Sequence, residues 1–324
     1  MHLFERQQQA MLAKKNSLFS SYMRQLETTH THNIFASCTA WQTGSSLDLK
    51  LLVNQGEYDR QAGGYFLRYN DFGICINPGP DFLKRLFALG FHLWHIDCVI
   101  NTSPADSSSF EIELIHSLAR QINLQLVENE QEPHVIRYLL HPETYAKKQA
   151  KLRPHFREER QAVSCLEPFE EGDERQLGDH VLFSYAAHEQ SLLSRFTLPN
   201  GVTLGYTSGV WSSAFSSFFQ STDILVCPYS EELTRSVPES CRLLFLSEFS
   251  LSEADIRLEA AKEIKTHRPA LSILPLEESV VLDLDEMTIT AQECLQEPTS
   301  ATHVRVIRLH DFEKMIYTSD EHTL

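Results

Sequence analysis

The stretch Ile96-Asp-Cys-Val-Ile-Asn-Thr-Ser-Pro-Ala-Asp-Ser-Ser-Ser109 decides how this sequence is interpreted. Its first part, Ile96 to Ile100, is an apolar run typical of a buried β-strand. The polar segment 101–109 follows, and residues 110–120 then have the apolar spacing of an amphipathic helix. Loops between a strand and a helix often carry the functional groups of a protein. We therefore expect a site in the loop 101–109.

Short strand-like segments separated by Gly, Asn and Asp dominate the rest of the chain, in two groups. The strands are expected at 35–40, 47–53, 64–69, 73–77, 96–100, 180–186, 202–206, 223–227, 243–246, 270–274, 280–284 and 304–309. Helices are expected at 81–89, 110–120, 211–220 and 252–265. Two β-rich halves with interspersed helices favour the α+β class, as an αββα sandwich with its helices on the outside.

Three further segments bear on domain organisation. Apolar residues at steps of seven and four predict an amphipathic N-terminal helix over residues 3–27, which packs on its own domain or serves as an arm for self-association. Residues 128–162 are charged and helix-like, and predict an insertion or a cap that faces a partner. The acidic residues 167–174 predict a solvated loop. The sequence thus predicts an N-terminal helical arm, 1–30, and one domain, 31–324.

The composition restricts the kinds of binding partner and indicates the cellular compartment. The chain has 44 acidic and 28 basic residues and a net charge of −16, which disfavours non-specific binding to nucleic acid or anionic membranes. No apolar run approaches the length of about 18 residues that a membrane span needs. The seven cysteines are scattered without a Cys-x-x-Cys pair, which favours reduced thiols and a cytoplasmic protein.

A family resemblance appears in the segment Gly73-Ile-Cys-Ile-Asn-Pro-Gly-Pro-Asp-Phe-Leu-Lys-Arg-Leu86. It resembles the strand and tight turn that open the metal site of metallo-β-lactamase-fold hydrolases. The segment 202–209 is similar to that family's strand ending in Tyr-Thr-Gly-Asp. Residues 244–249 and 274–280 resemble a ribonuclease-Z-like, phosphodiesterase-type branch of the family. The resemblance covers roughly residues 35–290 and implies an αββα sandwich.

The ligands that this family uses to hold two zinc ions are largely missing from the sequence. The family loop reads His-x-His-x-Asp-His, and its ligands fall here on Ser103, Ala105, Ser107 and Ser108. A later bridging Asp falls on Gly209, and the buttressing Asp at the end of the first strand is Asn77. His188 matches a family histidine. Because alanine and glycine have no donor and neutral hydroxyls bind zinc poorly, we expect no metal and no cofactor.

Polar residues around the loop are the candidates for ligand binding. They are Asn77, Thr102, Ser103, Asp106, Ser107, Ser108, His188 and Ser208. Hydroxyl and backbone N–H donors of this kind suit a phosphate or a nucleotide. A catalytic alternative uses Ser107 as nucleophile, His188 as base and Asp106 to orient the imidazole. The sequence has no Gly-x-Ser-x-Gly elbow and no recognisable oxyanion motif, so a polar pocket without catalysis is the favoured interpretation.

Three hypotheses about function follow. The first is a metal-free pseudoenzyme that binds a nucleotide-like ligand or a protein partner. Because the resembling branch includes anti-Pycsar-type cyclic-nucleotide phosphodiesterases, the resemblance implies bacterial signalling or phage–host conflict. The second is a phosphodiesterase-type hydrolase with a rebuilt site. The third is a structural adaptor subunit, a homodimer for example, that uses the N-terminal helix and the segment 128–162 as contact surfaces.

Overall fold

The structure is a computed structural model of the chain. It describes residues 34–37, 63–88, 91–128, 130–152, 164–169, 174–178, 181–188, 191–207, 209–247, 254–275, 280–284, 288–292 and 304–308. The N-terminal helix expected at 3–27 and the strand expected at 47–53 lie outside these residues, as does Ser208.

The described strands form two mixed sheets. The first sheet has the order β16 (Val304–Arg308), β15 (Thr288–Gln292), β14 (Val280–Asp283), β1 (Ile34–Ser37), β2 (Tyr65–Tyr69), β3 (Phe72–Ile76), β4 (Cys98–Asn101), β5 (Ile136–Leu140) and β6 (Ser164–Pro168). Strands from β16 to β3 pair antiparallel, and those from β3 to β6 pair parallel.

The second sheet repeats this mixture of antiparallel and parallel pairs. Its order is β13 (Ser272–Pro275), β12 (Leu243–Ser247), β11 (Ile224–Pro228), β10 (Thr203–Thr207), β9 (Ser191–Thr197), β8 (Val181–His188) and β7 (Glu174–Leu177). Strands β10 to β13 are parallel, while β7 to β10 are antiparallel. Parallel strands in each sheet place loops that come from different parts of the sequence at one edge.

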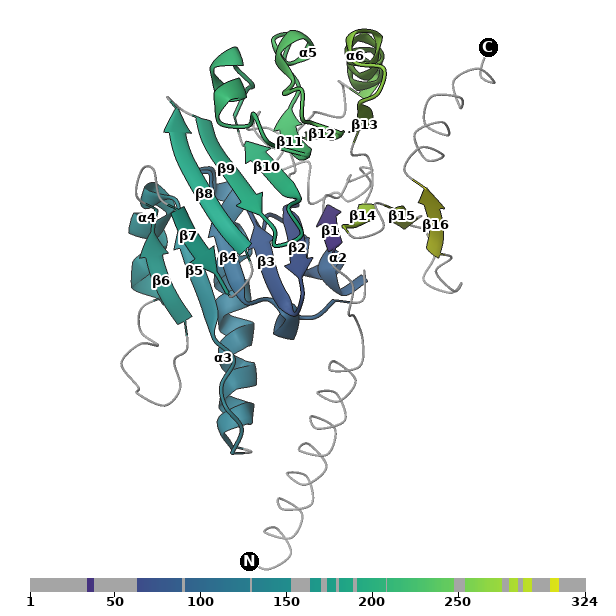
Figure 1. The fold of residues 1–324 in the computed structure, drawn as a ribbon. Helices are drawn as coiled ribbons and strands as arrows, with labels where there is room; N and C mark the ends of the chain where they lie inside the picture. Colours follow the sequence, from purple (N-terminus) through teal and green to yellow (C-terminus); the bar gives the residue numbers. More distant parts are fainter. Residues whose placement is uncertain are drawn as a thin grey trace, which may run out of the picture.

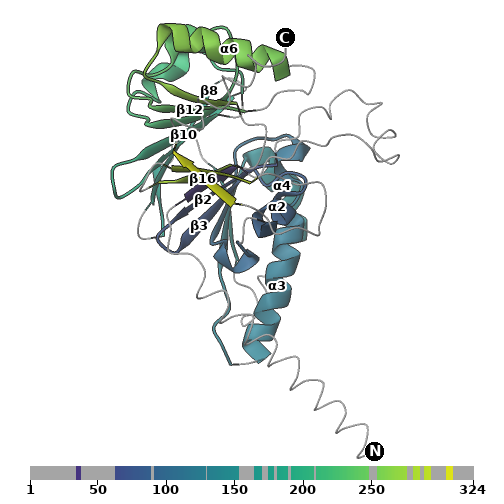
Figure 2. The same ribbon diagram turned by 90° about the vertical axis from the view of Figure 1, so that its right-hand side faces the viewer.

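Helices cover the outer faces of both sheets (Figures 1 and 2). On the first sheet lie α2 (Phe82–Ala88), α3 (Ile112–Glu128) and α4 (Pro142–Leu152), with the short 3-10 helices η3 (Leu93–His95) and η4 (Asp106–Ser109). On the second lie η6 (Ser213–Ser217), α5 (Leu233–Ser236) and α6 (Ala254–His267). No helix in the described part of the chain is both long and apolar enough to span a membrane.

Strand β4 shows why the chain adopts this layered fold. Cys98 and Ile100 point into the core between the two sheets, whereas Val99 points into the core beneath α2, α3 and α4. Successive side chains of a strand face opposite sides of its sheet, and both sides are buried here, so Cys98, Val99 and Ile100 are all apolar. A third core lies between the second sheet and its helices, and includes Trp211 and Phe219. The predicted αββα sandwich is therefore confirmed.

The prediction for residues 128–162 is wrong in its central part. Ile136–Leu140 form β5, a strand that pairs with β4 on one side and β6 on the other. Ile136, Tyr138, Leu139 and Leu140 are fully buried. The charged residues on both sides of this five-residue run obscured its strand pattern. Among the described residues of the segment, α4 has the helical, charged character that was expected. The helix expected at 211–220 is likewise reduced to the 3-10 turn η6.

The acidic residues predicted to lie in a solvated loop include a link between the two sheets. Glu167 lies in β6, at the edge of the first sheet, and Arg175 lies in β7, at the edge of the second. The Glu167 carboxylate pairs with both Arg175 and Arg137 of β5. One carboxylate shared by two guanidinium groups thus connects the sheets at this edge.

Each half of the chain uses an aspartate in the same way, just before a parallel strand. Asp97 precedes β4 and accepts a hydrogen bond from the Gly73 amide of β3 at 2.7 Å. Asp223 precedes β11 and accepts one from the Thr203 amide of β10 at 2.9 Å. Their surroundings differ, because Asp223 pairs with Arg242 at 3.1 Å, whereas burial raises the pKa of Asp97 to about 7.

The raised pKa of Asp97 predicts a pH-dependent cost to folding. Between pH 3.8 and about 7 the folded carboxyl keeps a proton that the unfolded chain releases, so its contribution to stability falls as pH rises. Asp97→Asn keeps an acceptor for the Gly73 amide without the charge. We expect this variant to gain stability over wild type across that pH range and to exceed it by about 2–4 kcal/mol at pH 8. Urea unfolding at several pH values measures the difference.

Asp223→Asn is the matched control, because it removes a carboxylate with the same backbone contact but with an arginine partner. It should lose stability at pH 8. A gain of similar size in both variants would contradict the assignment of the cost to the burial of Asp97.

Candidate functional site

The candidate site is built around the side chain of Asn77, directly after β3. Asn77 is 1% exposed and has a φ of +50°, a left-handed conformation that asparagine tolerates better than most residues. Its amide nitrogen donates to the hydroxyls of Thr102 and Tyr206, both at 2.8 Å. Its oxygen accepts from the Thr102 amide at 2.7 Å and from the side-chain nitrogen of Asn101 at 3.3 Å. The carboxamide therefore joins β3, the end of β4 and β10 of the opposite sheet.

Asn101 extends this network into the loop identified from the sequence. Its side-chain nitrogen also donates to the carbonyl and to the hydroxyl of Ser108, both at 3.2 Å. The Ser108 hydroxyl lies 2.7 Å from the Ala105 carbonyl and 3.1 Å from that of Ser103. Ser103 in turn accepts from the Ala105 amide at 3.2 Å. Side chains that were expected to face a ligand therefore make hydrogen bonds within the loop instead.

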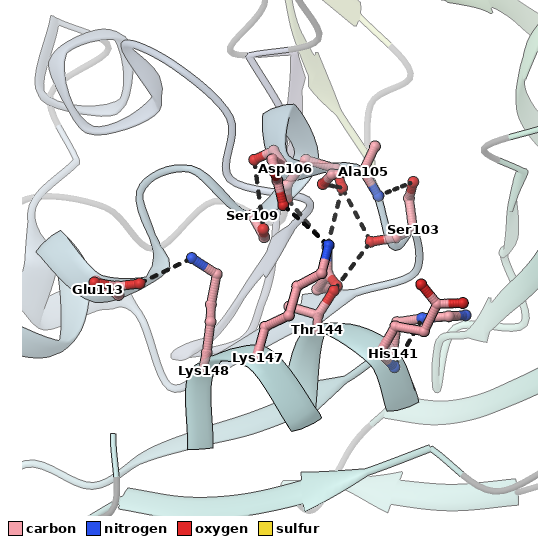
Figure 3. A network of polar contacts seen from close by, with 12 residues as sticks. Ser103, Ala105, Asp106, Ser109, Glu113, His141, Thr144, Lys147 and Lys148 are labelled. Atoms are coloured by element: carbon pink, nitrogen blue, oxygen red, sulfur yellow. Dashed lines mark hydrogen bonds and ion pairs between the residues drawn. The ribbon is translucent and has the colours of Figure 1, made fainter. Parts of the chain in front are cut away.

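Helix α4 holds the outer side of the loop (Figure 3). The Thr144 hydroxyl donates to the Ser103 carbonyl at 3.4 Å, and the Lys147 ammonium lies 3.3 Å from the Asp106 carboxylate. One turn further along α4, Lys148 and Lys151 pair with Glu113 of α3. Burial opposes the charge of Glu113, but hydrogen bonds from the two lysines lower its pKa overall. The contacts of α4 thus fix the loop relative to α3.

The predicted site residues separate into two groups. Asn77, Thr102, Ser103 and Ser108 come together in the hydrogen-bond network, and all but Ser103 are buried. Asp106 and Ser107 lie in the same loop but are exposed. The backbone of His188 ends β8, where it pairs with Ser191. The His188 side chain and Ser208 lie outside what the structure describes.

The hydrogen bonds of the loop decide which of its serine hydroxyls could act as a nucleophile. A serine becomes a nucleophile when an adjacent base accepts its proton. The Ser108 hydroxyl instead lies against two backbone carbonyls and Asn101. Asp106 pairs with Lys147 of α4. Ser107 is the exposed hydroxyl that remains for the catalytic alternative.

The loop after β10 completes this edge of the sandwich. Tyr206, at the buried end of β10, packs edge-on against Tyr65 with ring centroids 5.5 Å apart. The amide of Gly209 lies 3.4 Å from the hydroxyl of Thr207, and Val210 beside it is 68% exposed. The position where the resembling family has a bridging Asp thus carries a glycine whose only hydrogen-bonding groups are those of the backbone.

Four residues of this site were not proposed from the sequence. Asn101 follows the apolar run directly, and its place at the end of a strand was a signal that could have identified it. Tyr206 lies within the segment that resembles the family, but its contact with Asn77 spans 129 residues of sequence. Thr144 and Lys147 lie in the segment 128–162, whose position beside the loop became evident only from the structure.

The two sheets, their outer helices and the loops that meet at the edge define the metallo-β-lactamase fold. The metallo-β-lactamase fold protein YhfI from Bacillus subtilis is similar, with a TM-score of 0.50 and 15% identity over 74% of this chain and 96% of that one. Zinc-bound PqqB from Methylobacterium extorquens matches with a TM-score of 0.48 and 9% identity, over 78% and 100% of the two chains. Human tRNase Z, short form, matches with a TM-score of 0.41 and 12% identity, over 59% and 86%.

No protein-family model matches the sequence, and no curated protein matches it either. The likeness at such low identity concerns the fold alone. The more specific resemblance to a ribonuclease-Z-like branch stays a prediction.

The described side chains at this edge do not fit a pair of zinc ions. Among the described residues, no three His, Cys, Asp or Glu side chains are grouped so that they could hold a metal ion. The buried Oδ1 of Asn101 has no hydrogen-bond partner among the described residues, and one neutral amide oxygen is a poor substitute for imidazole, thiolate or carboxylate ligands. The donors that the structure describes at this edge therefore do not match the metal that the fold implies.

The network around Asn77 predicts a large loss of stability when its carboxamide is removed. Asn77→Ala eliminates hydrogen bonds to two strands and the following loop, and leaves buried polar groups without partners. We expect the free energy of unfolding to fall by about 3 kcal/mol, and by about 1 kcal/mol for Tyr206→Phe, which loses one hydroxyl. Urea unfolding measures both values.

Asn70→Ala is the control for backbone strain, because Asn70 also has a positive φ, +42°, but is exposed in the turn between β2 and β3. If Asn77→Ala costs no more than Asn70→Ala, the network does not hold this edge together.

Proposed function

We propose that the protein is a metal-free pseudoenzyme with the metallo-β-lactamase fold, which binds a ligand without hydrolysing it. The observation that carries the proposal is the hydrogen-bond network of Asn77, Asn101, Thr102 and Ser108. These groups hold the loop by bonding to one another. To accept a metal ion they would have to break bonds that are buried, and would offer neutral oxygens in return.

The ligand that best suits the exposed side of this loop is a nucleotide-like molecule. The side chain of Lys147 is 55% exposed and that of its partner Asp106 is 90% exposed, so water screens their pairing and a stronger anion competes with it. A phosphate group offers more negative charge and more acceptor oxygens than one carboxylate. The Ser107 hydroxyl on the same loop provides a further donor. An acidic segment of a protein partner is the other ligand that such a surface accommodates.

The proposal predicts the absence of both stoichiometric zinc and hydrolysis. Protein purified from zinc-supplemented cells should contain far less than one zinc ion per chain by elemental analysis. Its rate with cyclic nucleotides and with an activated phosphodiester should equal that of the His188→Ala and Ser107→Ala variants. Stoichiometric zinc that disappears in His188→Ala, or turnover that disappears in Ser107→Ala, would instead support the rebuilt hydrolase.

Binding at the loop predicts a dependence on Lys147. A panel of cyclic and linear nucleotides should include one that raises the melting temperature, since a ligand stabilises the state it binds. Lys147→Gln should lower the affinity for that ligand about tenfold in isothermal titration calorimetry, which is the effect expected from the loss of one charge-assisted hydrogen bond. Lys84→Gln removes an exposed lysine from α2 and should leave the affinity unchanged. Equal losses in both variants would assign the binding to overall charge.

A further inference from the structure

A groove lies between α5 and α6, on the outer side of the second sheet. Its volume is about 620 Å³, within the range of roughly 300–1,000 Å³ that small-molecule sites have. It is lined by Thr234, Arg235, Val237, Glu239, His267 and Arg268. The first four lie between β11 and β12, in α5 and the residues that follow it, and the last two are the end of α6 and the residue after it. Helices α5 and α6 lie against each other.

The charge of this groove is opposite to that of the whole chain. Among the described lining residues, Arg235 and Arg268 outnumber one carboxylate, Glu239, in a protein whose net charge is −16. The imidazole of His267 adds a group that can donate a hydrogen bond to an anion. A local excess of positive charge in a concave surface concentrates anions there.

Arg268 is held in a fixed position. Its Nη1 donates to the carbonyls of Val237 and Pro238 at 3.0 and 3.3 Å, and its Nη2 to those of Pro238 and Glu239 at 3.3 and 3.1 Å. Carbonyl oxygens carry no net charge, so these bonds orient the guanidinium without neutralising it. Arg235 is exposed at the rim and is the guanidinium that a ligand reaches directly.

We infer that this groove binds a small phosphorylated ligand. Of the six lining side chains that the structure describes, five are polar or charged and Val237 is apolar, so a hydrophilic anion suits the groove better than an apolar molecule. The exposed guanidinium of Arg235 can form paired hydrogen bonds with phosphate oxygens. The Nη groups of Arg268 are already bonded to carbonyls, so Arg268 contributes positive charge to the groove.

This groove is separate from the loop near Asn77. Residues 237–242 and 268–271 lead into the N-terminal ends of β12 and β13. Asn77 contacts Tyr206, close to the C-terminal end of β10, and β10 to β13 are parallel. The groove therefore lies toward the opposite ends of these strands, and its ligand is independent of the proposed nucleotide site.

Isothermal titration calorimetry of the full chain with inorganic pyrophosphate tests the inference. Wild type should bind at low salt, and Arg235→Gln should weaken binding about tenfold, as expected for a lost charge-assisted contact. Glu239→Gln removes a carboxylate of the groove and should strengthen binding about threefold, because it relieves repulsion at partly screened distances.

Matched variants separate the groove from the charge of the whole molecule. Arg120→Gln and Glu132→Gln make the same charge changes at exposed positions elsewhere and should leave the affinity unchanged, as should Lys147→Gln at the proposed nucleotide site. Absence of pyrophosphate binding, or equal effects of Arg235→Gln and Arg120→Gln, would overturn the inference. A loss of binding in Lys147→Gln alone would place the anion at the loop instead.

Discussion

The hydrogen bond between Asn77 and Tyr206 joins the two sheets of the sandwich at the edge where its loops meet. The side-chain nitrogen of Asn77 that donates to Tyr206 also donates to the Thr102 hydroxyl. The oxygen of the same carboxamide accepts hydrogen bonds from the Thr102 backbone amide and from the side-chain nitrogen of Asn101. Any displacement of Asn77 would therefore disturb β3, the loop after β4 and β10 together. Because buried polar groups need partners, this edge has one arrangement that satisfies nearly all of them.

The two ends of the β3–β4 pair show different solutions to burying polar groups. At one end, the Asp97 carboxyl accepts a hydrogen bond from the Gly73 amide, and burial raises the pKa of Asp97 to about 7. Gly73 itself has no room for a side chain, since a Cβ there would lie 1.8 Å from the His95 carbonyl oxygen. At the other end, a neutral carboxamide both donates and accepts, so Asn77 is buried without the cost of a charge.

The sequence predicted the parts of the fold that depend on local patterns. The apolar run before the loop became β4 with its two buried faces, and the unsuitable metal-ligand types of the loop were evident from residue identity alone. The sequence did not predict the features that depend on contacts between segments distant in the chain. The short apolar run of β5 lies between charged segments, and Glu167 is held by arginines of β5 and β7. Neither pairing leaves a periodic signal, and neither does the contact between Asn77 and Tyr206.

The identity of residue 77 connects the network to the proposed loss of metal binding. A carboxylate at this position would accept hydrogen bonds from the same hydroxyls and amides, but its negative charge would be buried between two sheets. Positive ions nearby would offset that charge, and without them an ionised carboxylate in such surroundings is strongly disfavoured. An amide avoids this cost, and it supplies the donor that Tyr206 and Thr102 receive. A neutral Asn77 and a loop whose aligned positions lack the family's metal ligands are therefore mutually consistent, because without a bound cation nothing would offset a buried carboxylate at residue 77.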